Sequence, residues 1–404
     1  MCELTKKSKL LILPDGPIGI QHGTYKYSKG ERVYIDNLAK NYKQVGIATF
    51  VLESGDEFYE TILHSKFNEK NITILPLPKS KLKKPSILQK LIQFVFVFFK
   101  LIREIRKYDV LYLFLPSYPS ACSFLICLLY NKKYFIYGAD DWVTASKCMF
   151  LWDKKKYFIF YKIFFLFNSV FEKLIIKNAI FGVAAGGQLV SKYRSFGCNS
   201  FFTVPRMNLK FTDKYVRKDT CNEENITIVS VGNLINDKAQ HILIDSFSLL
   251  YEKMNNINLI IIGTGPLKRK LELHIQRLDL SHQIQLYGYV EKQNELFDVL
   301  KKSDIFALSS VSEGFPRVLY EAMCMSLPIV STDVGGIGYL LKNKENALLI
   351  PSENVQMLTD ALYEVINNKT LRKKIIDNCS LTFDNIFKNQ DINQISNIHS
   401  NYLN

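Results

Sequence analysis

Short apolar runs alternate with helical patterns along the whole chain, in two successive sets. The runs of the first set occupy residues 9–13, 46–52, 72–75, 110–115, 134–137 and 180–184, and those of the second set occupy residues 226–231, 258–262, 284–286, 305–308, 328–331 and 347–350. Helical patterns occupy residues 31–42, 241–253, 267–278, 293–301, 318–325 and 355–366. Strands that are apolar throughout are buried on both faces, as in parallel sheets covered by helices. We therefore predict an α/β fold with two doubly wound, Rossmann-like parallel-sheet domains facing across a cleft.

A polar stretch at residues 214–225 separates the two sets, after a short run that ends at Pro205. We expect an N-terminal domain over residues 1–205 and a C-terminal domain over residues 206–404, whose last helices are candidates to pack back on the first domain. Ligands of doubly wound sheets bind beyond the carboxyl ends of the strands. The chemistry is therefore expected in the loops that follow the strands, at the cleft between the domains.

Positive charge is concentrated in the first half of the chain. The 404 residues hold 52 Lys+Arg and 38 Asp+Glu, a formal net charge of +14. Residues 1–215 hold 33 basic and 16 acidic side chains, a net +17, whereas residues 216–404 hold 19 and 22, a net −3. Such asymmetry indicates an anionic partner for the first half, either nucleic acid or a membrane surface.

Two lysine clusters of this half lie beside segments rich in aromatic and aliphatic residues. Lys79–Lys84 precede Ile87–Ile102, and Lys154–Lys156 open the second segment, Lys154–Phe171. Phe- and Leu-rich helices beside lysines favour an anionic membrane surface. The alternative is that both segments are buried helices with solvated lysines nearby. Nucleic acid is disfavoured as a partner, because the sequence carries no nucleic-acid-binding motif and lysine far outnumbers arginine in the basic runs.

No segment of the sequence has the pattern of a membrane-spanning helix. Residues 110–131 are uncharged, but Pro116 and Pro119 divide them into a strand pattern and a helix too short to span. The first residues lack the layout of a signal peptide, and the eight cysteines are too scattered for a disulfide framework. We expect a cytoplasmic protein that is peripheral on the inner face of the cell membrane.

Polar and glycine-containing loops follow the strands of the second set. Gly232 and Asn233 follow its first strand, and Lys238 stands near the next helix start, where a lysine can hold a phosphate. The loop after the second strand, residues 263–266, begins like the dinucleotide fingerprint but lacks its third glycine. This loop alone is therefore weak evidence for a nicotinamide cofactor.

The loop after residues 305–308 is the most informative part of the sequence. It carries Glu313 just before a helix start, where Gly314 allows a ligand to approach closely and Pro316 suits the first turn. Glu321 follows about two turns later, so both carboxylates can lie along one side of the helix. One can accept hydrogen bonds from a sugar and the other from a ribose, with a diphosphate at the helix start between them. The alternative is an acid that stabilises the helix dipole and a solvated glutamate.

Residues 312–316 with Glu321, followed by residues 328–336, closely resemble retaining family-4 glycosyltransferases (glycosyl transferases group 1) of the GT-B fold. Support comes, in the same order and at similar spacing, from Lys238, residues 263–266 and residues 286–290. The resemblance implies a retaining hexosyltransferase that moves a sugar from a nucleotide diphosphate sugar to an acceptor hydroxyl. The basic, membrane-facing first domain indicates that this acceptor is a lipid-linked glycan. The implied pathway makes a cell-surface polysaccharide such as capsule, exopolysaccharide or lipopolysaccharide. No cofactor is expected besides the nucleotide-sugar co-substrate.

The resemblance implies a role for each matching residue. Glu313 would contact the donor sugar, Lys238 the diphosphate and Glu321 the ribose. The donor-binding set comprises Asn233, Lys238, Gly265, Tyr289, Val290, Glu313, Gly314, Phe315, Arg317, Val318 and Glu321, with Tyr289 and Val290 beside the nucleobase. Asn233 stands where the family often has arginine, and Ala239 where it often has glycine. Lys238 should therefore matter more in this chain.

The acceptor side falls in the first half, where the resemblance is loose. Asp140 follows the strand at residues 134–137 and joins Glu313 and Lys238 as a candidate catalytic residue, with a helix cap as the alternative. Gly16 lies in a glycine-containing first loop, where His22 is more typical of an ordinary loop residue than of a catalytic base. A metal-independent reaction is expected, because the sequence places no metal-binding cluster or Asp-x-Asp motif for a divalent ion, and the adjacent Asp140 and Asp141 should point different ways. The alternative functions are a GT-B-fold sugar-nucleotide epimerase, a glycogen-type phosphorylase and a non-catalytic sugar-nucleotide-binding protein.

Overall fold

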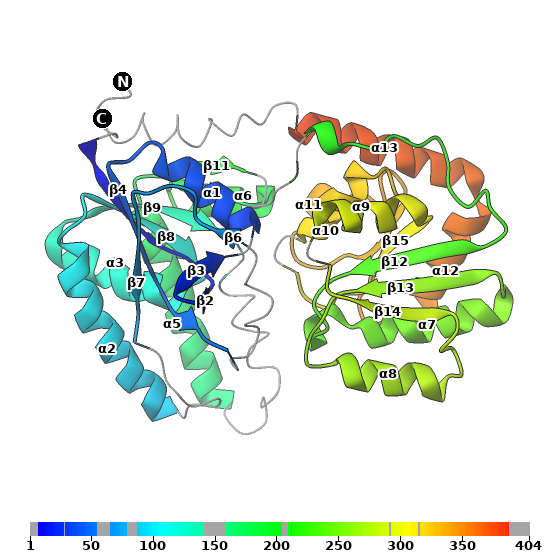
Figure 1. Cartoon of the computed structure of the whole chain (residues 1–404), viewed down its shortest axis with the longest axis horizontal. Helices are drawn as coiled ribbons and strands as arrows, with labels where there is room; N and C mark the ends of the chain where they lie inside the picture. Colours follow the sequence, from blue (N-terminus) through cyan, green and yellow to red (C-terminus); the bar gives the residue numbers. More distant parts are fainter. Residues whose placement is uncertain are drawn as a thin grey trace. The chain divides into compact units, whose positions relative to one another are not determined.

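The computed structural model of the chain is shown in Figure 1. It describes residues 7–27, 29–54, 65–78, 87–139, 142, 158–203, 209, 211–290, 292–313 and 316–387. These residues form two compact units, one before residue 209 and one from Leu209 onward. Six cysteines, each free, fall within the described ranges.

The first unit is built on a seven-stranded parallel sheet with the order β11-β10-β9-β8-β1-β4-β7. Its strands are β1 (Lys9–Leu13), β4 (Gln44–Thr49), β7 (Ile72–Pro76), β8 (Val110–Leu115), β9 (Lys133–Gly138), β10 (Gly182–Ala184) and β11 (Ser200–Phe202). Alternate side chains of β1 enter different cores: Leu11 and Leu13 on one face, and Leu10 and Ile12 on the other. Both faces of the sheet are therefore covered, as the apolar runs predict.

Helices α2 (Ile87–Ile105), α3 (Tyr118–Tyr130), α5 (Phe158–Lys177) and α6 (Gly187–Ser195) cover one face of this sheet, and α1 (Lys29–Ala39) covers the other. Val97 of α2, Phe124 of α3 and Ile175 of α5 are buried in the same core. Among the described residues, no helix is both long enough and apolar enough to cross a membrane.

A small four-stranded sheet in the first unit was not expected from the sequence. It has the order β5-β2-β3-β6, formed by β2 (Ile18–Gln21), β3 (Thr24–Tyr27), β5 (Val51–Leu52) and β6 (Ser65–Lys66). β2 and β3 make an antiparallel hairpin whose turn residues, His22 and Gly23, have φ values of 48° and 71°. Positive φ at both turn positions is the type I′ geometry that suits two-residue hairpins. Strands of two to four residues are too short to recognise by their periodicity.

The second unit is built on a six-stranded parallel sheet with the order β14-β13-β12-β15-β16-β17. Its strands are β12 (Ile226–Val231), β13 (Ile257–Ile262), β14 (Ile284–Gly288), β15 (Ile305–Leu308), β16 (Ile329–Thr332) and β17 (Leu348–Ile350). Its helices are α7 (Gln240–Lys253), α8 (Lys268–Arg277), α9 (Gln293–Lys302), α10 (Arg317–Cys324), α11 (Ile337–Leu340), α12 (Val355–Asn367) and α13 (Lys369–Phe387). α13 packs on α10 and α12 of the same unit. The prediction of two doubly wound parallel sheets is confirmed; residues beyond 387 lie outside the described part.

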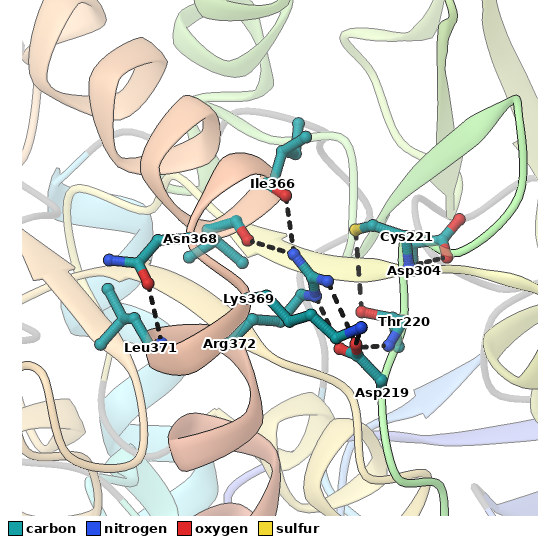
Figure 2. A network of polar contacts seen from close by, with 10 residues as sticks. Asp219, Thr220, Cys221, Asp304, Ile366, Asn368, Lys369, Leu371 and Arg372 are labelled. Atoms are coloured by element: carbon teal, nitrogen blue, oxygen red, sulfur yellow. Dashed lines mark hydrogen bonds and ion pairs between the residues drawn. The ribbon is translucent and has the colours of Figure 1, made fainter.

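A buried arginine ties α13 to the segment that leads into the second sheet (Figure 2). Arg372 Nε lies 2.8 Å from Asp219 Oδ1, and Arg372 Nη2 lies 3.3 Å from Asp219 Oδ2. Arg372 Nη1 donates to the carbonyl oxygens of Val365 and Ile366 at 3.1 and 2.6 Å, near the end of α12, where helix carbonyls lack partners of their own. Although burial alone would raise it, hydrogen bonds from Arg372 and from the Thr220 N–H hold the pKa of Asp219 below its usual range.

We expect Arg372→Ala to destabilise the second unit by about 3–5 kcal/mol, because it leaves the Asp219 carboxylate buried without its main partner. Lys369→Ala is the matched control: Lys369 Nζ lies 3.9 Å from Asp219 Oδ2 and is largely exposed, so its loss should cost less than about 1 kcal/mol. Urea unfolding of the full chain measures both. Equal midpoints for the two variants would show that Arg372 does not tie these segments together.

Candidate functional site

The order of the second sheet identifies where its loops can build a site. From β12 the chain winds through β13 to β14 on one side, and then returns to β15, β16 and β17 on the other side of β12. The strand order reverses between β12 and β15, which pair directly in parallel. Ligands of doubly wound sheets bind at this switch point, beyond the carboxyl ends of the strands. The loop after β12 and the loop after β15 therefore form the expected location.

An ion pair joins these two loops. Lys238 ends a 3₁₀ turn (Asn236–Lys238) that leads into α7, and Glu313 lies five residues after β15. Lys238 Nζ lies 2.6 Å from both Oε1 and Oε2 of Glu313. The Glu313 side chain is 5% exposed, whereas that of Lys238 is 23% exposed. A buried carboxylate is thus neutralised by an ammonium that solvent can still reach.

Hydroxyl groups fix the position of Glu313. Ser310 Oγ donates to Glu313 Oε1 at 2.6 Å, and Thr332 Oγ1, at the end of β16, donates to the Ser310 carbonyl at 2.7 Å. Ser309 Oγ donates to the carbonyl oxygens of Lys238 and Ala239 at 3.0 and 3.1 Å. The loops after three neighbouring strands are therefore held together around one carboxylate. The sequence interpretation missed this set of hydroxyls, although Ser309 and Ser310 directly follow β15.

Further loops reach the site through glycines, at points where two backbones lie too close together for any side chain. Gly335 has a φ of 57°, and a Cβ there would lie 1.7 Å from the carbonyl oxygen of Glu313. A Cβ on Gly263 would lie 1.9 Å from the Gly232 carbonyl oxygen, and one on Gly265 would lie 2.5 Å from that of Leu234. These glycines let the loops after β13 and β16 touch the loops after β12 and β15.

Ala239 occupies a backbone conformation that favours glycine. Its φ and ψ are 45° and 41°, in the left-handed region, between the 3₁₀ turn that ends at Lys238 and the start of α7. An alanine in this region costs about 1–2 kcal/mol relative to the right-handed one. The departure from the family's usual glycine at this position is therefore absorbed as local strain, and the turn that presents Lys238 still forms.

Glu321 lies on α10, which begins at Arg317 with Pro316 as its N-cap residue. Its side chain is partly accessible, yet burial of the carboxyl raises the pKa of Glu321 to about 7, against the lowering effect of Arg317. A carboxyl with such a pKa exchanges its proton near neutral pH. The alternative of a fully solvated glutamate does not describe this residue.

The remaining donor-side predictions fall on the same edge of the sheet or outside the described residues. Asn233 is exposed and its carbonyl accepts a hydrogen bond from Gln240 Nε2 at 2.9 Å. Tyr289 is exposed and Val290 is half-buried, just after β14, while Arg317 is exposed and Val318 half-buried in the first turn of α10. Gly314 and Phe315 lie outside the described residues.

The candidate acceptor-side residues belong to the first unit. Gly16 follows β1, and its carbonyl accepts a hydrogen bond from Thr49 Oγ1 at 2.9 Å. His22 is exposed at the tip of the β2–β3 hairpin, which begins at Ile18, two residues after Gly16. Asp140 lies outside the described residues, two positions after β9. Within the described ranges, no group of three His, Cys, Asp or Glu side chains is arranged to hold a metal ion.

Comparison with known proteins identifies the second unit. Residues 211–380 match the model of the family described as glycosyl transferases group 1. This match lies wholly within the second unit. It contains Lys238, Glu313 and Glu321, so the family resemblance read from these residues is confirmed.

Several curated glycosyltransferases are similar to parts of the chain. One from Methanocaldococcus jannaschii is 35% identical over 141 residues, which is 35% of this chain and 32% of that protein. The putative colanic acid biosynthesis glycosyltransferase WcaL of Escherichia coli is 28% identical over 178 residues, 42% of this chain and 44% of that protein. The N-acetylgalactosamine-N,N'-diacetylbacillosaminyl-diphospho-undecaprenol 4-alpha-N-acetylgalactosaminyltransferase of Campylobacter jejuni is 32% identical over 147 residues, 36% and 39% of the two chains. The chain thus spans less than half the length of these relatives.

Solved structures share the fold over nearly the whole chain. Anabaena Alr3699/HepE, crystallised with UDP-glucose, superposes with a TM-score of 0.66 at 16% identity, covering 98% of this chain and 99% of the other. Sucrose-phosphate synthase of Thermosynechococcus elongatus superposes with a TM-score of 0.70 at 13% identity and the same coverage. At these identities the likeness concerns the fold, and it confirms the predicted GT-B class.

We expect Gly335→Ala to weaken binding of a nucleotide diphosphate sugar markedly, because its Cβ would have to displace the backbone of Glu313. Gly197→Ala is the matched control, since Gly197 has a φ of 85° with nothing within 4 Å of a Cβ. It carries the backbone strain without the displacement. Calorimetric titration of both variants measures the difference, and equal losses of affinity would remove the positioning role of Gly335.

Proposed function

We propose that the chain is a retaining glycosyltransferase, which moves a sugar from a nucleotide diphosphate sugar to a hydroxyl of a lipid-linked glycan without a metal ion. The observation that carries this proposal is the cluster of Lys238, Glu313 and Ser310 at the switch point of the second sheet. The names of relatives support the pathway: WcaL with colanic acid, CapM of Staphylococcus aureus with capsular polysaccharide, and the Campylobacter enzyme with a diphospho-undecaprenol compound. Polysaccharide biosynthesis at the cytoplasmic face of the membrane fits these names.

In this mechanism the Lys238–Glu313 pair is exchanged for contacts with the donor. The diphosphate draws the Lys238 ammonium, and the freed Glu313 carboxylate accepts hydrogen bonds from sugar hydroxyls. As the bond between sugar and diphosphate breaks, negative charge grows on the leaving group beside Lys238 and the positive, N-terminal end of the α10 dipole. Retention of configuration is inferred from the likeness of residues 312–321 to the retaining family.

The proposal gives Glu321 the ribose. Its carboxyl group accepts hydrogen bonds from ribose hydroxyls most strongly when it is ionised, so binding favours loss of the proton that it holds near neutral pH. Tyr289 and Val290 border the nucleobase, and Asp140, with Gly16 and His22, stands on the acceptor side as the candidate reaction-centre residue. A lipid-linked acceptor requires the enzyme to work as a peripheral protein at the membrane surface.

We expect Glu313→Ala and Lys238→Ala each to lower kcat/KM for sugar transfer by about 100-fold or more, since each removes a charge placed against the donor. The control is Lys253→Ala, which disrupts an exposed ion pair with Asp360 in the same unit and should leave transfer unchanged. Product analysis with and without acceptor separates the alternatives. Isomerised sugar nucleotide without acceptor would indicate an epimerase, and binding without turnover a non-catalytic protein.

Glu313→Gln should behave differently with a nucleoside diphosphate that carries no sugar. Because this change releases Lys238 from its ion pair, we expect the diphosphate to bind several-fold more tightly than to the unaltered chain, while sugar transfer is lost. Titration calorimetry of both proteins measures this. Weaker diphosphate binding in Glu313→Gln would mean that Lys238 does not move from the carboxylate to the diphosphate.

Nucleotide binding should strengthen as the pH rises through 7. A carboxyl whose pKa is about 7 is mostly protonated at pH 6 and mostly ionised at pH 8, so affinity for a nucleoside diphosphate should rise about tenfold over this range. The Glu321→Gln variant should lack this tenfold rise in affinity and show only the pH dependence that belongs to the ligand itself. Identical pH profiles for the two proteins would exclude Glu321 as the ribose acceptor.

A further inference from the structure

The outward side of α2 carries large apolar side chains in place of polar ones. Ile92, Val95, Phe96 and Phe99 are spaced by three and four residues, so they form one stripe on the helix. Phe96 is 60% exposed and Phe99 is 59% exposed. The stripe lies opposite Val97, Leu101 and Ile105, the side chains that α2 buries against the sheet. α2 is therefore apolar on two opposite sides, of which the sheet covers one.

Two neighbouring helices repeat this arrangement. On α5, Leu166, Val170 and Leu174 are exposed at intervals of four residues, opposite the buried Ile175 and Ile176. On α3, Leu128 and Leu129 are exposed in the last turn. Soluble monomers rarely expose contiguous apolar patches of this kind, and those that do use them for interaction.

The three helices cover the same face of the first unit's main sheet (Figure 1). The rings of Phe94 on α2 and Tyr118 on α3 lie 5.4 Å apart, and so do those of Phe124 on α3 and Phe171 on α5. Because their inward sides pack into one core, their outward sides face the same direction. We call the exposed apolar side chains of α2, α3 and α5 the outer apolar surface.

Basic side chains continue the same stripes. Arg103 and Arg106 extend the exposed stripe of α2 toward its C-terminal end, and Lys173 and Lys177 do the same on α5. Arg106 is fixed at the α2–α3 junction, where Nη2 donates to Tyr130 Oη at 2.7 Å.

The acidic side chains of these helices do not offset that charge. Glu104 pairs with Lys107, and Glu172 is buried and paired with Lys192. Among the described residues of the three helices, the excess exposed charge is positive.

We propose that the outer apolar surface docks on an anionic lipid bilayer, with its rings and aliphatic chains in the boundary between headgroups and acyl chains. The flanking arginines and lysines then meet lipid phosphates. A second copy of this chain is the other possible occupant, but its like-charged rim would oppose the contact. The inference extends the proposed function by giving the lipid-linked acceptor a place beside the enzyme, and it does not require that the transferase assignment be correct.

Co-sedimentation of the full chain with vesicles tests this inference. We expect binding to phosphatidylcholine vesicles that contain phosphatidylglycerol, weaker binding in high salt, and little binding to phosphatidylcholine alone. Phe96→Asp with Phe99→Asp should abolish binding, and Lys173→Gln with Lys177→Gln should weaken it on the order of tenfold. Leu381→Asp, at an exposed leucine of α13, and Lys268→Gln with Lys270→Gln, at exposed lysines of α8, are the matched controls and should bind as the unaltered chain does.

Three results would overturn the inference. Equal binding to neutral and anionic vesicles would show that the basic residues play no role in docking. Unchanged vesicle binding by the Phe96→Asp, Phe99→Asp variant would show that α2 plays none. A dimer in light scattering that this pair dissociates, without vesicle binding, would assign the surface to a second copy. Glu313→Ala, which lacks transfer under the proposed function, should still bind vesicles, so failure of one proposal is distinguishable from failure of the other.

Discussion

A buried carboxylate needs a counter-charge, and the second unit supplies one to Glu313 from a different loop. Lys238 Nζ approaches both carboxylate oxygens at 2.6 Å, and Ser310 adds a hydrogen bond. An unpaired charge at this depth would cost several kcal/mol, so the loops after β12 and β15 have to stay together. The glycines of the neighbouring loops serve the same constraint, because they allow backbone contacts that a Cβ would prevent. Under the proposed function, this cation and anion stay paired until a ligand with both an anionic and a hydroxylated part replaces the pair.

The opposite edge of the second sheet serves stability. There Arg372 and Asp219 join α12, α13 and the segment before β12, and Arg217 donates to the carbonyls of Ser303 and Met325 at 2.8 and 3.0 Å. These arginines satisfy helix-end carbonyls that have no intrahelical partner. The two edges of the sheet therefore differ: its amino edge is fixed by arginines, and its carboxyl edge carries the ion pair of Lys238 and Glu313.

Much of the fold could be predicted because its signals are local. Strands buried on both faces must be apolar throughout, and this pattern located the strands of the two main sheets within a few residues, except β11. The small sheet formed by β2, β3, β5 and β6 escaped because its strands are too short to show a period, and its pairing joins residues far apart in sequence. The burial of Glu321 escaped for a related reason, since position in a helix does not reveal what packs around a side chain.

The sequence by itself determined the two α/β units and the positions of the loops after the strands. It also pointed to Lys238, Glu313 and Glu321 as candidate donor-binding residues. Periodicity and glycine placement depend on neighbouring residues, so they can be read without coordinates. Only the tertiary structure decided that Lys238 and Glu313, 75 residues apart, form one ion pair with Ser310 at its side. It also decided which apolar residues of α2, α3 and α5 are left outside the core. Both depend on contacts between distant segments, and burial is a property of the packed chain and not of its local pattern.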